Sequence, residues 1–78
     1  MTKIQEDQFL DCRGLNCPLP ILKTSKVISD MRKGEIVKMV STDQGSISDV
    51  DAFTRRTGHK LLDSEAGDGE YIFYIRKV

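Results

Sequence analysis

The residues best suited to chemistry stand in one short segment near the start of the 78-residue chain, Cys17-Pro18-Leu19-Pro20. Proline is favoured in the first turn of a helix, because the amides of that turn have no intrahelical partner and proline has no amide hydrogen to leave unpaired. The segment therefore predicts a helix with Pro18 at its first position and Cys17 at or beside the N-cap. Free amides and the positive end of the helix dipole would then lie near the sulfur and favour the nucleophilic thiolate.

The residues before this segment predict the loop that presents the sulfur to solvent. Gly14 can supply the turn between a preceding strand and the helix. Cys12 is the only other cysteine, and its C-x4-C spacing to Cys17 differs from the C-x2-C of thioredoxin-like pairs. Two roles stay open for Cys12: a spectator thiol near the end of the strand, or a resolving thiol that forms a disulfide with Cys17 or receives its sulfur.

The combined pattern Asp11-x-x-Gly14-Leu15-x-Cys17-Pro18-x-Pro20 resembles the signature of the TusA/SirA family of small sulfur carriers. The resemblance extends from the strand before Asp11 to the end of the chain. It implies a sulfur carrier that takes up sulfane sulfur as a persulfide on Cys17 and passes it to an acceptor thiol. Asp11 and Gly14 match loop-shaping positions of the motif, as do both prolines. Whether such a sulfurtransferase-like carrier is an enzyme is a matter of definition.

The resemblance also implies two partner proteins and no cofactor. One partner donates sulfur, for example a cysteine desulfurase or a rhodanese-like enzyme, and the other accepts it. In the family the sulfur goes to tRNA thiolation, to molybdenum cofactor assembly or to sulfur oxidation, and the sequence does not distinguish these pathways. We expect the free carrier to be a monomer.

A helix that follows Pro18 has a buried stripe and a mixed outer side. At about 100° per residue, the stripe consists of Ile21, Thr24, Val27, Ile28 and Met31. Leu19 and Leu22 lie outside it, together with Lys23 and Lys26. They are either ordinary exposed leucines or part of a docking surface for the sulfur donor or acceptor. Arg13 is either a solvated surface charge or a group that attracts an anionic donor or stabilises the persulfide.

The composition excludes several classes of protein. Twelve basic and twelve acidic side chains cancel, which argues against direct nucleic-acid binding or attachment to an anionic membrane. The chain has neither an N-terminal apolar segment nor a run long enough to cross a membrane, so we expect a cytoplasmic protein. Two cysteines and the single His59 do not make a structural zinc site, and nothing in the sequence places His59 beside Cys17.

The order of the elements predicts the fold class. Ser46, with Asp49 in an approximate capping box, is expected to cap the second helix, whose apolar face is Ile47, Val50 and Phe53. Gly34 and Gly58 are expected to end the two helices, and Gly67-Asp68-Gly69 to form a hairpin turn. The predicted strands are 8–11, 35–41, 59–64 and 70–77, and the predicted helices are 18–33 and 46–57. We therefore expect one α/β domain over 1–78, with residues 1–6 frayed: a βαβαββ two-layer sandwich in which two helices cover one face of a four-stranded mixed sheet.

Two other functions remain open at this point. A thiol–disulfide redox protein would use Cys12 and Cys17 and would form a reversible intramolecular disulfide. A non-catalytic RNA- or protein-binding module is suggested only by analogy with similar folds, and its RNA binding would survive removal of Cys17.

Overall fold

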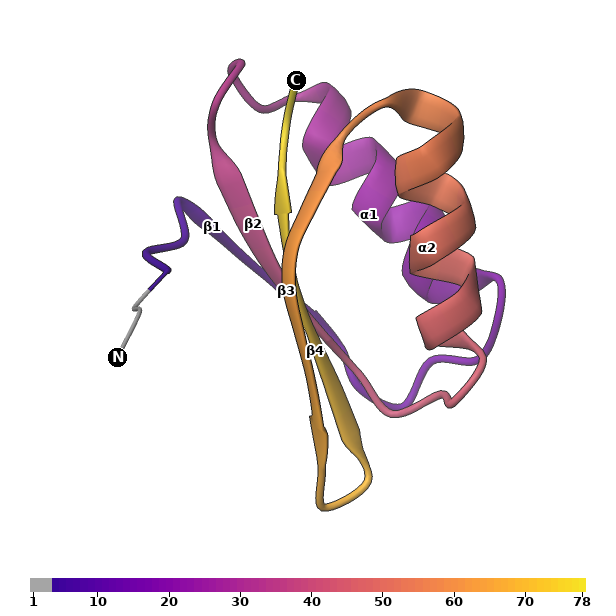
Figure 1. Ribbon diagram of the computed structural model, residues 1–78. Coiled ribbons are helices and arrows are strands. Elements are labelled where there is room, and N and C mark those ends of the chain that lie inside the picture. The colour runs from indigo at the N-terminus through magenta and orange to yellow at the C-terminus, as the bar shows by residue number, and fades with distance from the viewer. Residues whose placement is uncertain (1–3) are drawn as a thin grey trace.

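The computed structural model of the protein describes residues 4–78. The elements follow in the order β1 (Gln8–Cys12), α1 (Leu19–Ser29), β2 (Ile36–Ser41), α2 (Ser46–Thr57), β3 (Lys60–Gly67) and β4 (Glu70–Arg76). Both helices lie on the same side of one sheet (Figure 1), so the predicted βαβαββ two-layer sandwich is confirmed. Of the segment expected to be frayed, 1–3 lies outside the described residues, and 4–6 forms neither helix nor strand.

The sheet has the strand order β1-β2-β4-β3. β1 and β2 are parallel, because α1 carries the chain back between them. β4 pairs antiparallel with both β2 and β3, so β2 is an interior strand, as predicted. The hairpin between β3 and β4 turns at Asp68 and Gly69, whose φ values of 54° and 77° suit a tight two-residue turn. β3 extends beyond the predicted end at Ser64 to reach this hairpin.

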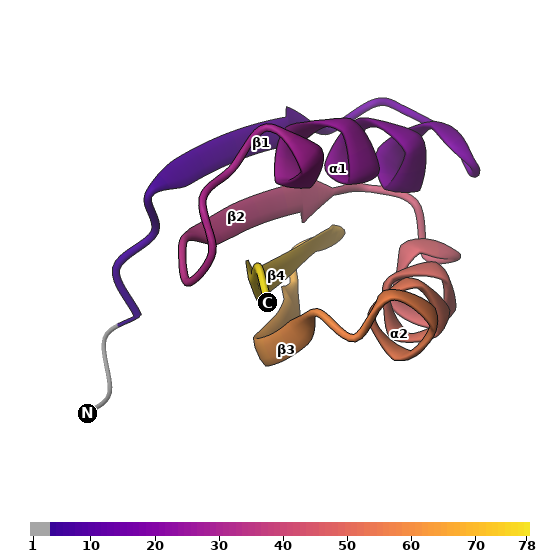
Figure 2. The same cartoon turned by 90° about the horizontal axis from the view of Figure 1, so that it is seen from above.

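The core lies between the helices and the sheet. α1 packs on β1 and β2, while α2 packs on β3 and β4 (Figure 2). The predicted stripe of α1 faces this core: Thr24, Ile28 and Met31 are buried, and Ile21 and Val27 are partly buried against it. The buried hydrophobic cluster consists of Cys12, Ile28, Met31, Val37, Met39, Val50, Phe53, Phe73 and Ile75.

Helix α1 ends at Ser29, earlier than the predicted Lys33. The ammonium group of Lys77, from the end of the chain, donates to the carbonyl oxygens of Ser29 at 3.3 Å and Met31 at 2.6 Å. This satisfies carbonyls that the helix leaves without a partner. Gly34 has the expected left-handed φ of 89°, but it lies in the turn before β2 and not at the helix C-cap.

Ser46 is the first residue of α2 and not its cap, which corrects the prediction. Its N-cap is Gly45, and no side chain caps the helix. The hydroxyl of Ser46 is buried and lies 2.6 Å from the hydroxyl of Ser41 at the end of β2. Asp49 consequently has no capping-box partner and is free for another contact. Gly58 ends the helix with a φ of 85°, as predicted.

Within residues 4–78, no helix has the length and apolar character needed to cross a membrane.

Candidate functional site around the Cys17 thiol

Cys17 lies in the loop between β1 and α1, where it is exposed and its thiol is free. Pro18 was predicted at the first helical position, but helix α1 begins at Leu19 and Pro18 is its N-cap. Pro20 takes the favoured place inside the first turn. Cys17 therefore lies beside the N-cap, as predicted, and the Cys17–Pro18 peptide bond is cis.

The start of α1 offers the sulfur few amide hydrogens. Pro18 and Pro20 have none, and the amide of Leu19 donates to the carbonyl oxygen of Asn16 at 2.8 Å. The same prolines that favour a helix at this point thus remove the donors that were expected to stabilise a thiolate. The start of α1 alone therefore does little to stabilise a thiolate on Cys17.

The nearest partner of the sulfur is a carboxylate from α2. The thiol of Cys17 donates to Oδ2 of Asp49, with Sγ and Oδ2 2.8 Å apart. This hydrogen bond raises the pKa of the Cys17 thiol, and partial desolvation and the charges of Asp49 and Asp43 act in the same direction. The prediction of an environment that favours the thiolate was wrong, because it considered only the local helix and not the second one.

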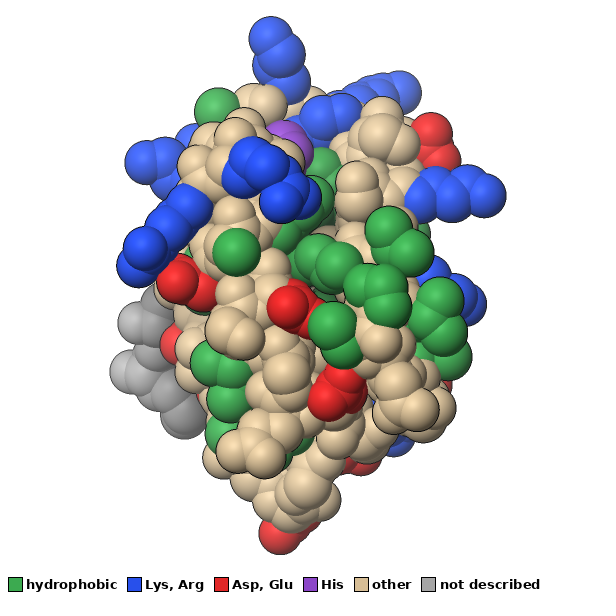
Figure 3. Space-filling model, turned by 90° about the vertical axis from the view of Figure 1, so that its right-hand side faces the viewer, with side chains coloured by type: hydrophobic (Ala, Val, Ile, Leu, Met, Phe, Trp, Pro, Cys, Tyr) green, Lys and Arg blue, Asp and Glu red, His purple; other side chains and the backbone are tan. Residues whose placement is uncertain are grey.

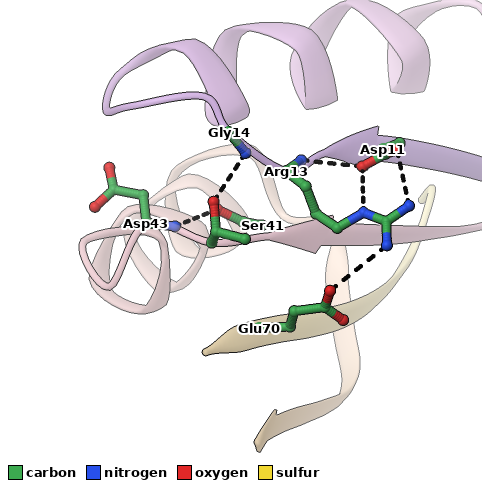
Figure 4. A network of polar contacts seen from close by, with 7 residues as sticks. Asp11, Arg13, Gly14, Ser41, Asp43 and Glu70 are labelled. Carbon is green, nitrogen blue, oxygen red and sulfur yellow. Dashed lines mark hydrogen bonds and ion pairs between the residues drawn. The ribbon is translucent and has the colours of Figure 1, made fainter. Parts of the chain in front are cut away.

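Asp43 fixes the loop from the other side. Its Oδ2 accepts a hydrogen bond from the backbone amide of Cys17 at 2.5 Å, and its Oδ1 accepts one from the amide of Gly45 at 3.0 Å. The amide of Asp43 itself donates to the hydroxyl of Ser41 (Figure 4). One half-buried carboxylate therefore ties the cysteine loop to the turn that begins α2.

Asp11, Arg13 and Gly14 shape the first half of the loop (Figure 4). Oδ1 of Asp11 accepts the backbone amide of Arg13 at 3.0 Å, and both carboxylate oxygens accept hydrogen bonds from the Arg13 guanidinium. This guanidinium holds the pKa of Asp11 at about 2, and it also reaches Glu70 of β4 at 3.5 Å. Gly14 has a φ of 82°, and its amide donates to the hydroxyl of Thr42 at 2.8 Å.

Cys12 differs from Cys17 in its surroundings. It is fully buried at the end of β1, and its sulfur lies 3.9 Å from the carbonyl oxygen of Pro20. Burial raises the pKa of its thiol. The structure therefore contains one exposed thiol and one thiol inside the hydrophobic core.

Hydrophobic side chains gather on the face that the two helices form (Figure 3). Leu19 and Leu22 are 46% and 58% exposed, and Lys23 and Lys26 are exposed beside them on α1. Ile47, at the start of α2, is 49% exposed, although it was predicted to be on the apolar face. The helical wheel gives a signal for this, because Ile47 lies about 120° from Phe53 at the edge of that face.

Nothing in the sequence indicated that Asp43 and Asp49 contact the cysteine. Both are distant from Cys17 in the chain, and they meet it only because α1 and α2 begin at the same end of the sheet (Figure 1). His59 lies at the opposite end of α2, where its Nδ1 accepts the amide of Val78 at 3.1 Å. Among the described residues, no three His, Cys, Asp or Glu side chains are grouped so that they could hold a metal ion.

Comparison with known proteins agrees with this architecture. The family model of the sulfurtransferase TusA matches residues 8–77. The sulfur carrier protein TusA of Allochromatium vinosum is 45% identical over 71 residues, which cover 91% of this chain and 93% of that protein. A putative sulfur carrier protein of Halobacterium salinarum is 45% identical over 72 residues, or 91% of this chain and 89% of that protein.

A solved structure has the same fold. The SirA-like protein of Desulfitobacterium hafniense superposes with a TM-score of 0.79 over 88% of this chain and 95% of that chain, at 18% identity. The family model and the two relatives each cover nearly the whole chain, which therefore belongs to the TusA family.

Proposed function

We propose that the protein is a sulfur carrier that holds sulfane sulfur as a persulfide on Cys17. The observation that carries the proposal is the exposed, free thiol of Cys17 at the cysteine position of the family's motif. The names of the relatives support the coarser role of sulfur carrier. The accessible position of Cys17 suits a group that must meet the sulfur of one protein and then of another.

The transfer conserves atoms and oxidation state. The Cys17 thiolate attacks the outer sulfur of a donor persulfide, a new bond forms between the two sulfurs, and the bond between the donor's inner and outer sulfurs breaks. The donor leaves as a thiolate and takes up the proton that Cys17 lost. Cys17 then carries –S–SH, and an acceptor thiolate attacks the outer sulfur in the same way. No cofactor or metal takes part in these steps.

We propose that the donor and the acceptor dock on the helical face beside Cys17. Leu19, Leu22 and Ile47 would form its apolar part, with Lys23 and Lys26 at its side. Arg13 has a smaller role in docking, because its guanidinium already pairs with Asp11 and Glu70. We propose a persulfide-bearing cysteine desulfurase or rhodanese-like protein as the donor and the cytoplasm as the place of transfer.

The burial of Cys12 favours the carrier over a thiol–disulfide redox protein. A resolving thiol must reach the exposed sulfur of Cys17, yet Cys12 is enclosed in the core and its pKa is raised by that burial. We propose that Cys12 contributes to packing only.

The test uses a cysteine desulfurase and cysteine whose sulfur is radioactively labelled. We expect labelled sulfur on the wild-type protein and on Cys12→Ala, no label on Cys17→Ala, and release of the label by a thiol reductant. Label that persists on Cys17→Ala would contradict the assignment of the carrier residue. A protein that gains no label but forms an intramolecular disulfide under oxidant would instead be a redox protein.

A further inference from the structure

We propose that Asp49 is a restraining residue of the sulfur carrier: it holds Cys17 as the neutral thiol and so limits the reaction of the empty carrier with electrophiles. The inference rests on the proposed function of Cys17 and adds to it a residue that the motif does not contain. It follows from the contact of 2.8 Å between the sulfur of Cys17 and Oδ2 of Asp49.

The charged side chains that shift the pKa of the Cys17 thiol, Asp43 and Asp49, are both acidic. Asp49 comes from α2 and Asp43 from the loop between β2 and α2, and both raise the cost of a negative charge on Cys17. The only ion pairs within residues 4–78 join Arg13 to Asp11, Arg13 to Glu70 and Arg55 to Asp51. In the described part of the chain, therefore, no cation neutralises Asp43 or Asp49.

The position of Asp49 makes its effect on the sulfur direct. The side chain is partly buried on the first turns of α2, and it accepts the thiol hydrogen itself. Loss of that hydrogen would leave a thiolate and a carboxylate in contact, so the thiol form is favoured as long as Asp49 is charged. Because the thiolate is the reactive form, the exposed cysteine is less reactive than its exposure alone suggests.

The same contact affects the loaded carrier. Once Cys17 carries a second sulfur, its Sγ has no hydrogen to donate, and the close approach of Oδ2 is no longer favourable. The negative charge also favours the protonated –S–SH group, which is the form that an acceptor thiolate can attack.

The experiment measures the rate of alkylation of Cys17 by iodoacetamide as a function of pH, in a Cys12→Ala background. Asp49→Asn removes the charge and keeps the shape of the side chain. Asp51→Asn is the matched control, because it removes an exposed carboxylate two positions along the same helix that pairs with Arg55 instead. Circular dichroism and thermal unfolding establish that each variant is folded.

We expect Asp49→Asn to lower the midpoint of the profile for Cys17, and Asp51→Asn to leave it in place. The rate at pH 7 should rise, but by less than the thiolate fraction does, because a thiolate of lower pKa is also a weaker nucleophile. Coincident profiles for the two variants, or a higher midpoint in Asp49→Asn, would overturn the proposal.

A measurement on the unsubstituted side chain covers the case in which Asp49→Asn does not fold. The ultraviolet absorbance of the thiolate in Cys12→Ala, after subtraction of the tyrosine absorbance recorded for the same protein without Cys17, gives the midpoint for Cys17, and we expect it above that of a free cysteine, about 8.5. A midpoint below that value would overturn the proposal without any variant of Asp49. Neither assay needs a sulfur donor, so failure of sulfur loading and failure of the restraint are separate results.

Discussion

The sulfur of Cys17 and the carboxylate of Asp49, which are 32 positions apart in the sequence, form a hydrogen bond of 2.8 Å. The bond joins the starts of the two helices and reverses the effect expected from the first helix alone. A helix N-terminus ordinarily favours a thiolate, but here two prolines remove amide donors and a carboxylate takes the place of a positive group. This arrangement raises the pKa of the exposed Cys17 thiol and favours its neutral form.

The helical face beside Cys17 should control recognition of the sulfur donor. Leu22→Ser removes the most exposed of the leucines on α1. We expect the rate of sulfur loading from a subsaturating protein donor to fall about tenfold, equivalent to about 1.4 kcal/mol of binding free energy. Loading is measured by mass spectrometry over time at several donor concentrations.

Two comparisons show whether the effect of Leu22→Ser is one of docking. Leu62→Ser removes a leucine that is 39% exposed on the edge strand β3, and it should leave the loading rate unchanged. Iodoacetamide needs no docking surface and should react equally with both variants. Equal loss of loading in Leu22→Ser and Leu62→Ser would contradict the proposed surface.

The conformation of Gly14 should be costly for any other residue. Its φ of 82° lies in the left-handed region, although a Cβ there would have no atom within 4 Å. Gly14→Ala should therefore lower the free energy of unfolding by about 1–2 kcal/mol through backbone strain alone. Denaturation by urea measures the change. Gly67→Ala, at a site that is equally open but has no positive φ, should be nearly neutral, and an equal loss in both would exclude strain as the cause.

The ion pair of Asp11 and Arg13 should make stability depend on pH in the acid range. The pKa of Asp11 is lowered from 3.8 to about 2 in the folded protein. A carboxylate with a lowered folded-state pKa contributes stability that is fully present above about pH 5 and is lost as the pH falls through about 2. Asp11→Asn keeps an oxygen for the amide of Arg13 but cannot titrate. We expect the difference in unfolding free energy between wild type and Asp11→Asn to shrink from about pH 5 to about pH 2. A difference that stays constant over this range would show that the charge of Asp11 is not involved.

Features that depend on local sequence were predicted well. The spacing of apolar residues identified the buried side of α1 and the interior strand β2, and Asp68-Gly69 identified the hairpin. These features depend on the periodicity of apolar side chains and on the backbone conformations that residues close together in the sequence prefer. The motif around Cys17 could be identified for the same reason, because its residues are close together in the sequence.

Features that depend on distant contacts were not predicted. Helix α1 ends early where Lys77 reaches its carbonyls, and Ser46 does not cap α2 because its hydroxyl pairs with Ser41. The acidic surroundings of Cys17 arise in the same way, through residues that only the folded sheet brings together. Propensity and capping patterns describe a segment, and tertiary partners can override them.

The central claim is that Cys17 carries a persulfide, and intact-mass spectrometry without reductant tests it most directly. Wild type, Cys12→Ala and Cys17→Ala are each incubated with a cysteine desulfurase and cysteine. We predict a gain of one sulfur atom in wild type and in Cys12→Ala, and no gain in Cys17→Ala. A gain in Cys17→Ala, or a wild-type protein that gains no sulfur from any sulfane donor and instead loses two hydrogens under oxidant, would contradict the account.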